Sequence, residues 1–578
     1  MTGVTPVRPL HTSRGCGPGL TPGGTTVADC HRHVTRRHSI RFAAFVATFG
    51  LVAALFSGVG GASTAARAHQ KVHQKGGGDL TFGLEAENTN YCLSSAQMAI
   101  SGIQVTAAIY DTLAVPNAKG KAVPYLAKSI TPNADFTEWT IGLPSGVKFH
   151  DGTSLDAAAV KLNLDAYRGA PGAPNSGVLF PPLLKFVTAV TVVDPSTVKI
   201  TLSTSMPNFP SWLYANGRFG IMAPAQLNAG AACSTKMIGT GPFMLKEDNQ
   251  GDHTTVVKNP NYWQKGYPKA NSITFVPVSD GATRVNQFQG GQLDLMHTNG
   301  APAIDQLKGL SGVKLMIEKP GFRETRQYVL NATKAPFDNP DARKAFVLAT
   351  DRVTIRQLMT KNLFQEANNL VDKSAPGYIK NAGYPSYNLK AAKKLVAKVK
   401  AANGGKFDII LGTTDDSENK REVTELKQEL AKAGINGTLS QSLQANLITD
   451  AVTGKFHVFI WRQQYGEYAA GGDFDSYPWF GSPGGKPYLT NFAHIADPAI
   501  QSALDAGRAA STLAAAKKAY QDLSKAIAKS LTYIPVWYPT WVIASQSGVK
   551  VTLPNLPGGG GKPQFEYGRI PVLGLSKG

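Results

Sequence analysis

The stretch that decides the fold reads Gly142-Leu-Pro-Ser-Gly-Val-Lys-Phe-His-Asp-Gly-Thr-Ser-Leu-Asp156. It continues a strand pattern at residues 139–143 and contains the turn residues His150-Asp-Gly152. Thr153 or Ser154 is expected to cap a helix that runs to Tyr167, because hydroxyl side chains accept hydrogen bonds from the free amides at a helix start. The stretch therefore predicts a strand, a turn and a helix in close succession.

Strand and helix patterns alternate on both sides of this stretch. Before it, residues 79–85 alternate as a first strand does, and residues 96–110 have a helical pattern. After it, β-branched runs at residues 189–193 and 198–202 flank Asp194-Pro-Ser196, which is typical of a hairpin. Both arrangements predict sheet structure in the first half of the chain.

Beyond Gly290 the pattern changes to helices separated by buried strands. The expected helices are residues 342–351, 389–402, 418–433 and 498–530, and the expected strands are 407–411 and 456–461. Apolar, β-like sequence follows from residue 533. This alternation predicts a mixed α/β lobe.

The N-terminal segment has the features of a secretion signal. Arg36-Arg37 precede the apolar residues 42–59, and small residues then lead to Ala66-Arg67-Ala68. We expect residues 1–68 to be a leader that is cleaved after Ala68, with retention as a membrane anchor as the alternative. The paired arginines also suggest the twin-arginine type of signal. Residues 69–78, with three consecutive glycines, are expected to form a flexible linker.

Charge and cysteine content narrow the partners and the compartment. The 578-residue chain carries a net charge of +20, of which seven arginines and one aspartate give the leader +6. The lysines are scattered, several of them on expected helix faces, so a solvated surface explains the charge better than nucleic-acid binding does. Outside the leader only Cys92 and Cys233 remain. An even pair in an oxidising compartment predicts a disulfide, with two free buried thiols as the alternative.

Further segments, in this order and spacing, match the motifs of one family. Besides residues 147–160 they are residues 190–202, Ile238-Gly-Thr-Gly-Pro-Phe243, Asn259-Pro-Asn-Tyr-Trp263, and residues 288–295, 331–351, 460–461 and 473–477. Together they resemble family 5 of the extracellular solute-binding proteins, which serve ABC importers of peptides, nickel and similar cargo. The resemblance covers residues 79–553.

This resemblance implies an α/β fold, the large two-lobed periplasmic-binding-protein fold of type II with an additional subdomain in the first lobe. The expected parts are a first lobe at residues 79–320 with its subdomain at about 122–230, a second lobe at 321–530, and a return to the first lobe at 531–578. The implied function is capture of a solute, in the first place a short peptide, at the outer face of the cytoplasmic membrane. Delivery is to the permease and ATPase subunits of an ABC importer, by a secreted monomer that needs no cofactor and binds no nucleic acid.

Ligand contacts are expected on loops that follow the predicted strands and face the cleft between the lobes. The candidates are Glu85, Asn90, Tyr91, Arg326, Trp461, Arg462, Tyr465, Asp473, Asp475, Tyr477, Trp479 and Trp537. By the resemblance, Asp473 pairs the amino terminus of a peptide, while Arg462 or Arg326 could hold a carboxylate end bidentately. A surface loop, a structural ion pair or core packing is the alternative for each candidate.

Two departures from the family leave the cargo open. The usual Asp-Pro is Asp473-Phe474 here, and residues 462–472 form a long insertion before it. Both lie where the resemblance implies ligand contact, so sugars, opines and nickel chelates stand beside peptides as cargo. A receptor module that uses the same lobes for sensing without transport is a further alternative.

Enzyme and metal motifs do not appear in the sequence. There is no HExxH, GxSxG or Walker A motif, and Pro563 follows the Gly558-Gly-Gly-Gly-Lys562 run where a phosphate loop needs Ser or Thr. The histidines show no spacing typical of metal ligands. Neither catalysis nor a metal site is therefore expected.

Overall fold

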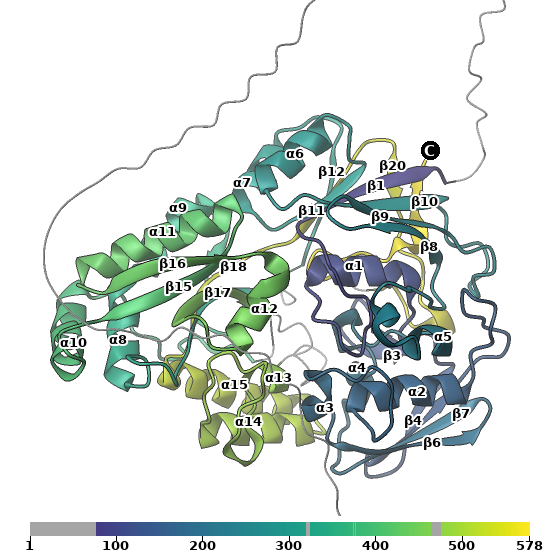
Figure 1. Cartoon of the computed structure of the whole chain (residues 1–578), viewed down its shortest axis with the longest axis horizontal. Coiled ribbons are helices and arrows are strands. Elements are labelled where there is room, and N and C mark those ends of the chain that lie inside the picture. Colours follow the sequence, from purple (N-terminus) through teal and green to yellow (C-terminus); the bar gives the residue numbers. More distant parts are fainter. Residues whose placement is uncertain (1–76, 320–323, 374, 376, 464–475, 564) are drawn as a thin grey trace, which may run out of the picture. The chain divides into compact units, whose positions relative to one another are not determined.

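The computed structural model describes residues 77–319, 324–373, 375, 377–463, 476–563 and 565–578 (Figure 1). All of them belong to one compact unit, His73–Gly578. We call the part built on its seven-stranded sheet the first lobe, and the part built on its six-stranded sheet the second lobe. The predicted leader lies outside the described residues. Within the described ranges, every helix is too short or too polar to cross a membrane.

The seven-stranded sheet is centred on the first predicted strand. In spatial order its strands are β12 (Lys314–Ile317), β19 (Val542–Ser545), β11 (Leu295–Thr298), β1 (Asp79–Leu84), β10 (Ser272–Pro277), β9 (His253–Lys258) and β8 (Phe243–Asn249). β1 runs parallel to β10 and β11, so that Phe82 lies opposite Phe275 and Leu295. The outer pairs are antiparallel. Central strands of this kind are buried on both faces, and Phe82, Phe275 and Leu295 are almost fully buried.

Three helices of the first lobe bring their first turns to the cavity described below. They are α1 (Ile100–Ile109), α6 (Gly281–Gln289) and α7 (Ala301–Lys308). α1 is buried at all but one of its residues and contacts β8 and β9. It is shorter than the predicted helix over residues 96–110, since residues 96–99 have no helical structure. The smaller elements of the first lobe are β2 (Ala114–Pro116), β3 (Ala122–Pro124), α3 (Phe180–Leu183), α4 (Phe209–Trp212), α5 (Pro224–Leu227), β20 (Val549–Val551) and β21 (Leu575–Lys577).

A four-stranded sheet and one helix form around the quoted stretch. The strands are β4 (Ser129–Pro132), β5 (Glu138–Gly142), β7 (Thr197–Leu202) and β6 (Val187–Asp194), and α2 (Ala157–Arg168) packs against them. The predicted hairpin is confirmed as β6–β7. The predicted cap is wrong: Asp156 caps α2 by accepting from the Ala159 amide at 2.8 Å. Thr153 is instead held by Asp151, which accepts from its amide and hydroxyl within the turn.

A disulfide joins Cys92 to Cys233, with 5.0 Å between their Cα atoms. It ties the segment after β1 to the short 3-10 helix Gly230–Ser234. Both cysteines are buried in the main core of the first lobe.

The six-stranded sheet mixes parallel and antiparallel pairs. In spatial order its strands are β14 (Gln365–Glu366), β18 (Tyr533–Tyr538), β13 (Thr325–Leu330), β17 (Val458–Gln463), β15 (Asp408–Thr414) and β16 (Asn436–Ser442). Its helices are α8 (Pro340–Ala349), α9 (Arg352–Thr360), α10 (Leu389–Ala402), α11 (Ser417–Lys432), α12 (Gln444–Val452), α13 (Tyr477–Phe480), α14 (Pro498–Ala509) and α15 (Leu513–Ser530). Helix α10 has the predicted bounds. The predicted helix over residues 498–530 is two helices, because Ala510 is extended and Thr512 caps a new start.

The chain passes from one large sheet to the other twice. The first passage lies between β12 and β13, and the second lies between β18 and β19 (Figure 1). β18 still pairs within the second lobe, so the return follows Tyr538. The lobe boundaries given above stay predictions.

Candidate functional site

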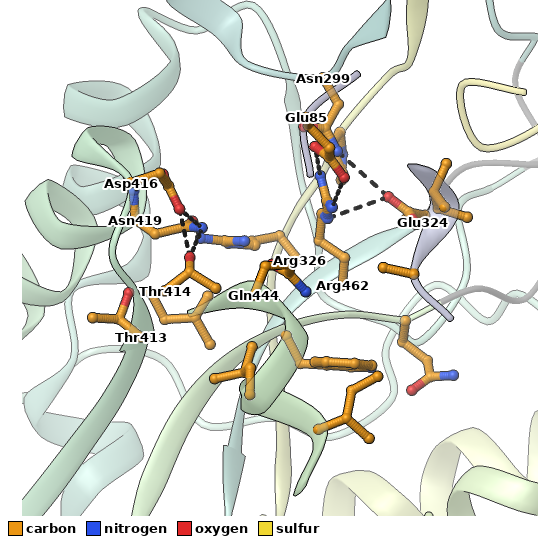
Figure 2. Close-up of a pocket in the computed structure, with 18 of the residues that line it drawn as sticks. Glu85, Asn299, Glu324, Arg326, Thr413, Thr414, Asp416, Asn419, Gln444 and Arg462 are labelled. Atoms are coloured by element: carbon orange, nitrogen blue, oxygen red, sulfur yellow. Dashed lines mark hydrogen bonds and ion pairs between the residues drawn. The ribbon is translucent and has the colours of Figure 1, made fainter. Parts of the chain in front are cut away.

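A cavity of about 210 Å³ is lined by both lobes. The first lobe contributes residues after β1 and at the starts of α1, α6 and α7, and the second lobe contributes the ends of β15 and β17 and the start of α11. Ten charged side chains line it: Glu85, Arg218, Arg284, Glu324, Arg326, Asp415, Asp416, Glu418, Glu422 and Arg462. Figure 2 shows several of them pointing toward one another.

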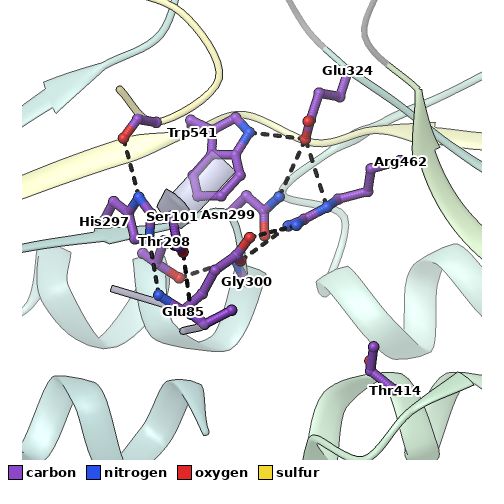
Figure 3. Close-up of polar contacts among 12 residues, drawn as sticks. Glu85, Ser101, His297, Thr298, Asn299, Gly300, Glu324, Thr414, Arg462 and Trp541 are labelled. Carbon is purple, nitrogen blue, oxygen red and sulfur yellow. Dashed lines mark hydrogen bonds and ion pairs between the residues drawn. The ribbon is translucent and has the colours of Figure 1, made fainter. Parts of the chain in front are cut away.

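Arg462 of β17 forms an ion pair with Glu85, which follows β1 in the other lobe. Arg462 donates from Nη2 to Glu85 Oε1 at 2.5 Å and from Nη1 to Oε2 at 3.2 Å. Its Nε lies 3.7 Å from Glu324 Oε2, and its guanidinium carbon lies 5.0 Å from the centre of the Trp541 ring (Figure 3). A bidentate pair fixes geometry as well as charge. Arg462 therefore contacts residues of both lobes, and two of these residues, Glu324 and Trp541, lie next to the two passages of the chain between the lobes.

The pair is strong because it is largely shielded from water. The side chains of Arg462 and Glu85 are only 22% and 17% exposed. Burial alone would raise the pKa of Glu85, but the Arg462 charge and hydrogen bonds outweigh it and lower this pKa to about 2. Burial would lower the pKa of Arg462, and Glu85 and Glu324 raise it instead. Both groups are therefore ionised at neutral pH.

His297 of β11 supports Glu85 from behind. Its Nε2 accepts from the Glu85 amide at 2.9 Å, and its Nδ1 lies 3.1 Å from the carbonyl oxygen of Gly568 (Figure 3). These partners require a neutral ring that donates from Nδ1. Burial lowers the pKa of His297 to about 4, in agreement with a neutral ring.

Arg326 of β13 is paired within its own lobe. It donates to Glu422 of α11 from Nε at 2.9 Å and from Nη2 at 2.5 Å, and it also donates to Asn419. Burial raises the pKa of Glu422, and Arg326 acts in the opposite direction. Arg326 also lies 5.7 Å from the centre of the Trp537 ring. The two arginines predicted to hold a ligand carboxylate thus both have carboxylate partners in the protein.

One wall of the cavity is aromatic. Trp461 and Trp479 pack on Phe492, with ring centres 5.1 and 5.4 Å from it and 6.0 Å from each other. The Nε1 atoms of both tryptophans are buried and have no hydrogen-bond partner among the described residues. The hydroxyl of Thr413, a residue that is 1% exposed, also lacks one there. These donor atoms have almost no accessible surface, so a solute in the cavity would meet the faces of the two tryptophan rings rather than their N–H groups.

Six of the predicted contact residues line this cavity: Glu85, Arg326, Trp461, Arg462, Trp479 and Trp537. Asn90 and Tyr91 do not, since the Asn90 side chain accepts from the Cys92 amide at 2.9 Å and Tyr91 is buried beside the disulfide. Tyr477 is also turned away. Its hydroxyl donates to Asp505 at 2.8 Å, and the Arg508 guanidinium lies 3.4 Å from its ring centre. Tyr465, Asp473 and Asp475 lie outside the described residues.

Sequence reasoning missed several lining residues. Thr413, Thr414 and Asp416 follow a predicted buried strand, so the rule that selected Trp461 would have found them. Glu324, which lines the cavity, and His297, which contacts Glu85 without lining the cavity, gave no local signal, because a single acid and a single histidine in apolar surroundings are common. No group of three or more possible metal ligands occurs among the residues that the structure describes.

Comparison with known proteins gives one consistent result. Residues 121–487 match the sequence model of the bacterial extracellular solute-binding proteins, family 5 Middle. The chain is 30% identical over 389 residues to the glutathione-binding protein GsiB of Escherichia coli K12, which covers 66% of this chain and 73% of that protein. More than half of the chain therefore has a family assignment.

Solved structures show the same architecture. AgaA of A. tumefacien R10, in complex with agropinic acid, matches with a TM-score of 0.74 and 26% identity over 86% of this chain and 99% of its own. The periplasmic binding protein DppA of Helicobacter pylori, in complex with the peptide STSA, matches with a TM-score of 0.75 and 20% identity over 87% and 99%. These matches confirm the predicted two-lobed α/β fold of type II periplasmic binding proteins.

Proposed function

Because this chain belongs to family 5 of the bacterial extracellular solute-binding proteins, we propose that it captures a short peptide between its lobes and delivers it to an ABC importer. On this proposal it acts as a secreted monomer outside the cytoplasmic membrane. Its partners are the permease and ATPase subunits of the importer. It performs no catalysis and uses no cofactor.

The observation that carries the peptide proposal is the aromatic wall that Trp461, Trp479 and Phe492 form along the cavity. The rings themselves supply apolar area for side chains of any kind. Such a wall suits a class of ligand with a constant backbone and variable side chains.

The relatives favour the same class. GsiB is named as glutathione-binding, and glutathione is a short peptide; DppA holds the peptide STSA. AgaA holds agropinic acid, and its 26% identity makes that ligand the second candidate.

Asp473 keeps its proposed role as the partner of the ligand amino terminus. For Arg462 we propose a different role from the predicted carboxylate contact. Its donors already meet Glu85 and Glu324, so a ligand carboxylate would have to displace a protein carboxylate to reach it. We propose that Arg462 sets the lobe arrangement and that Trp461 and Trp479 touch the solute.

A thermal-shift screen of the purified protein tests the function. The panel contains glutathione, di- to pentapeptides, agropinic acid and nickel–histidine. A ligand at 100 times its Kd stabilises the native state by about 2.7 kcal/mol, which is a readily measured rise in melting temperature. The proposal expects the rise with peptides and its loss in Asp473→Ala. A rise with agropinic acid or the nickel chelate alone would contradict the peptide cargo, and no rise with any member would favour the sensing alternative.

A further inference from the structure

The start of α11 in the second lobe meets the starts of α6 and α7 in the first. Ser417 donates from its hydroxyl to Asp280 Oδ2 at 2.5 Å. Asp280 also caps α6, since its other oxygen accepts from the Thr283 amide at 2.9 Å. Glu418, the next residue of α11, lines the cavity together with Gly281 and Gly300. This contact therefore lies at the cavity and joins the two lobes.

Glu418 approaches Gly300 more closely than any other residue type would allow. A Cβ atom added to Gly300 would lie 2.5 and 2.6 Å from the two carboxylate oxygens of Glu418, and one added to Gly281 would lie 3.2 Å from the nearer oxygen. The backbone angles of Gly300 are φ −74° and ψ 123°, which any residue adopts. Glycine is therefore needed at position 300 to leave space for the Glu418 carboxylate, and not to allow unusual backbone angles.

Helix α7 has no side chain at its N-cap position, which is Gly300. The hydroxyl of Thr298 accepts from the Gly300 amide at 3.1 Å. The free amides at a helix start carry a partial positive charge that a nearby carboxylate stabilises. Glu418 brings a carboxylate to this helix start from the other lobe, and Arg284 of α6 adds a full positive charge nearby. Burial and the charge of the nearby Asp416 raise the pKa of Glu418, while Arg284 and Arg326 act in the opposite direction.

We propose that Glu418 is a positioning residue whose carboxylate packs against the start of α7, and that the glycine at position 300 leaves the space for it. The contact holds the second lobe against the first at the edge of the cavity, and it therefore favours the arrangement of the lobes that encloses a solute. This inference rests on the proposed function in one respect, that the lobes enclose a solute. The contact between the lobes can itself be measured without any ligand.

Disulfide trapping measures how often this contact between the two lobes forms. Asp280→Cys and Ser417→Cys place two thiols where the hydrogen bond between the lobes lies, and mild oxidation of the full chain then cross-links the lobes whenever they meet. The rate of the 280–417 cross-link is followed by mass spectrometry of the linked peptides. In this background we expect Gly300→Ser to slow cross-linking about fivefold, as expected for loss of a partly buried charge at a helix start.

Serine is chosen at position 300 because it separates an effect on the contact between the lobes from an effect on folding. Serine is a better N-cap than glycine, so a purely structural role predicts that Gly300→Ser leaves α7 as stable or more stable. The Cβ of the new serine displaces the Glu418 carboxylate. Glu418→Gln removes the charge of the same group, so we expect it to slow cross-linking by a similar factor. The combination of both changes should be no slower than either alone, because both remove the same contact. Gly309→Ala is the matched control at the other end of α7, where an added Cβ has no neighbour closer than 3.4 Å.

Each outcome decides the proposal. Equal rates for Gly300→Ser and Gly309→Ala, additive slowing in the combined variant, or no cross-link in the parent would overturn it. A fall in melting temperature that matches the slowing would assign Gly300 a folding role and would also overturn it. A failed ligand screen with the expected cross-linking pattern would refute the peptide function alone, and the reverse result would refute the role of Glu418 alone.

Discussion

Replacing Arg462 with methionine should expose how much the ion pair between the lobes contributes to stability. The change keeps roughly the length of the side chain and removes the positive charge beside Glu85 and Glu324, while Glu324 still accepts from the indole of Trp541. Because Arg462 holds the pKa of Glu85 at about 2 instead of 4.5, the ionised state of Glu85 is favoured by about 3 kcal/mol in the folded protein. Both side chains are less than a quarter exposed, so water screens little of this energy.

The assay is a double-mutant cycle with Glu85→Gln, Arg462→Met and both changes together, measured as free energy of unfolding in urea. We expect a coupling energy of about 3 kcal/mol at neutral pH. The folded pKa of Glu85 is depressed, so its stabilisation is fully present above pH 4.5 and is lost as the pH falls toward 2. At about pH 3.5 the coupling should have decreased to about 2 kcal/mol.

The matched control is the ion pair between Lys361 and Asp305, which also joins the second lobe to the first. Its charges are 3.4 Å apart, and the two side chains are 76% and 62% exposed. The same cycle on this pair should give less than about 0.5 kcal/mol, as is usual for exposed pairs. Equal coupling for the two pairs, or a coupling for Arg462 and Glu85 that does not change with pH, would refute the reasoning.

Three further predictions concern single features. Trp461→Phe should weaken binding of a peptide identified in the screen about fivefold in titration calorimetry, because the smaller ring leaves less apolar area for the ligand; Trp139→Phe, which makes the same change outside the cavity, should not. Replacing Cys92 and Cys233 with serine should lower the free energy of unfolding by about 5 kcal/mol, because the disulfide closes a loop with a sequence separation of 141; a change below about 1 kcal/mol would contradict this. His297 has a depressed pKa of about 4, so the protein should lose stability as the pH falls from 6.5 toward 4, and His297→Gln should flatten that part of the urea stability profile.

Local sequence patterns predicted most of the regular elements because the forces that set them are local. The bounds of α10 follow from the spacing of its apolar residues and from the asparagines at its two ends, and the β6–β7 hairpin follows from two β-branched runs around a turn. The cap of α2 was predicted wrongly because three polar residues compete there. Asp151 already bonds Thr153 within the turn, which leaves the helix start to Asp156.

The candidate site was predicted only in part, for a reason of chain topology. Residues directly after a buried strand, such as Glu85, reach the cavity because strand ends of both sheets open toward it. Asn90 and Tyr91 lie a few residues further on, where the turn and the disulfide hold them elsewhere. Sequence order could rank these residues only by distance from the strand. Their actual partners depend on contacts with residues that are far away in the sequence, and no local pattern shows these contacts.

Whether a charge in the cavity is available to a ligand is a different question from whether it lines the cavity. Arg462 and Glu85 are 377 residues apart, and no local pattern connects them. A buried charge without a partner costs several kcal/mol, so a chain that places an arginine at the cavity must also place a carboxylate or receive one from the ligand. Here the chain supplies its own carboxylates to both Arg462 and Arg326. Among the described residues that line the cavity, the buried polar atoms without a hydrogen-bond partner include one oxygen of Glu422 as well as the indole nitrogens of Trp461 and Trp479 and the hydroxyls of Thr360 and Thr413. A terminal carboxylate of a ligand would therefore meet arginines that are already paired, and we expect peptide binding to depend on the aromatic wall more than on such a charge pair.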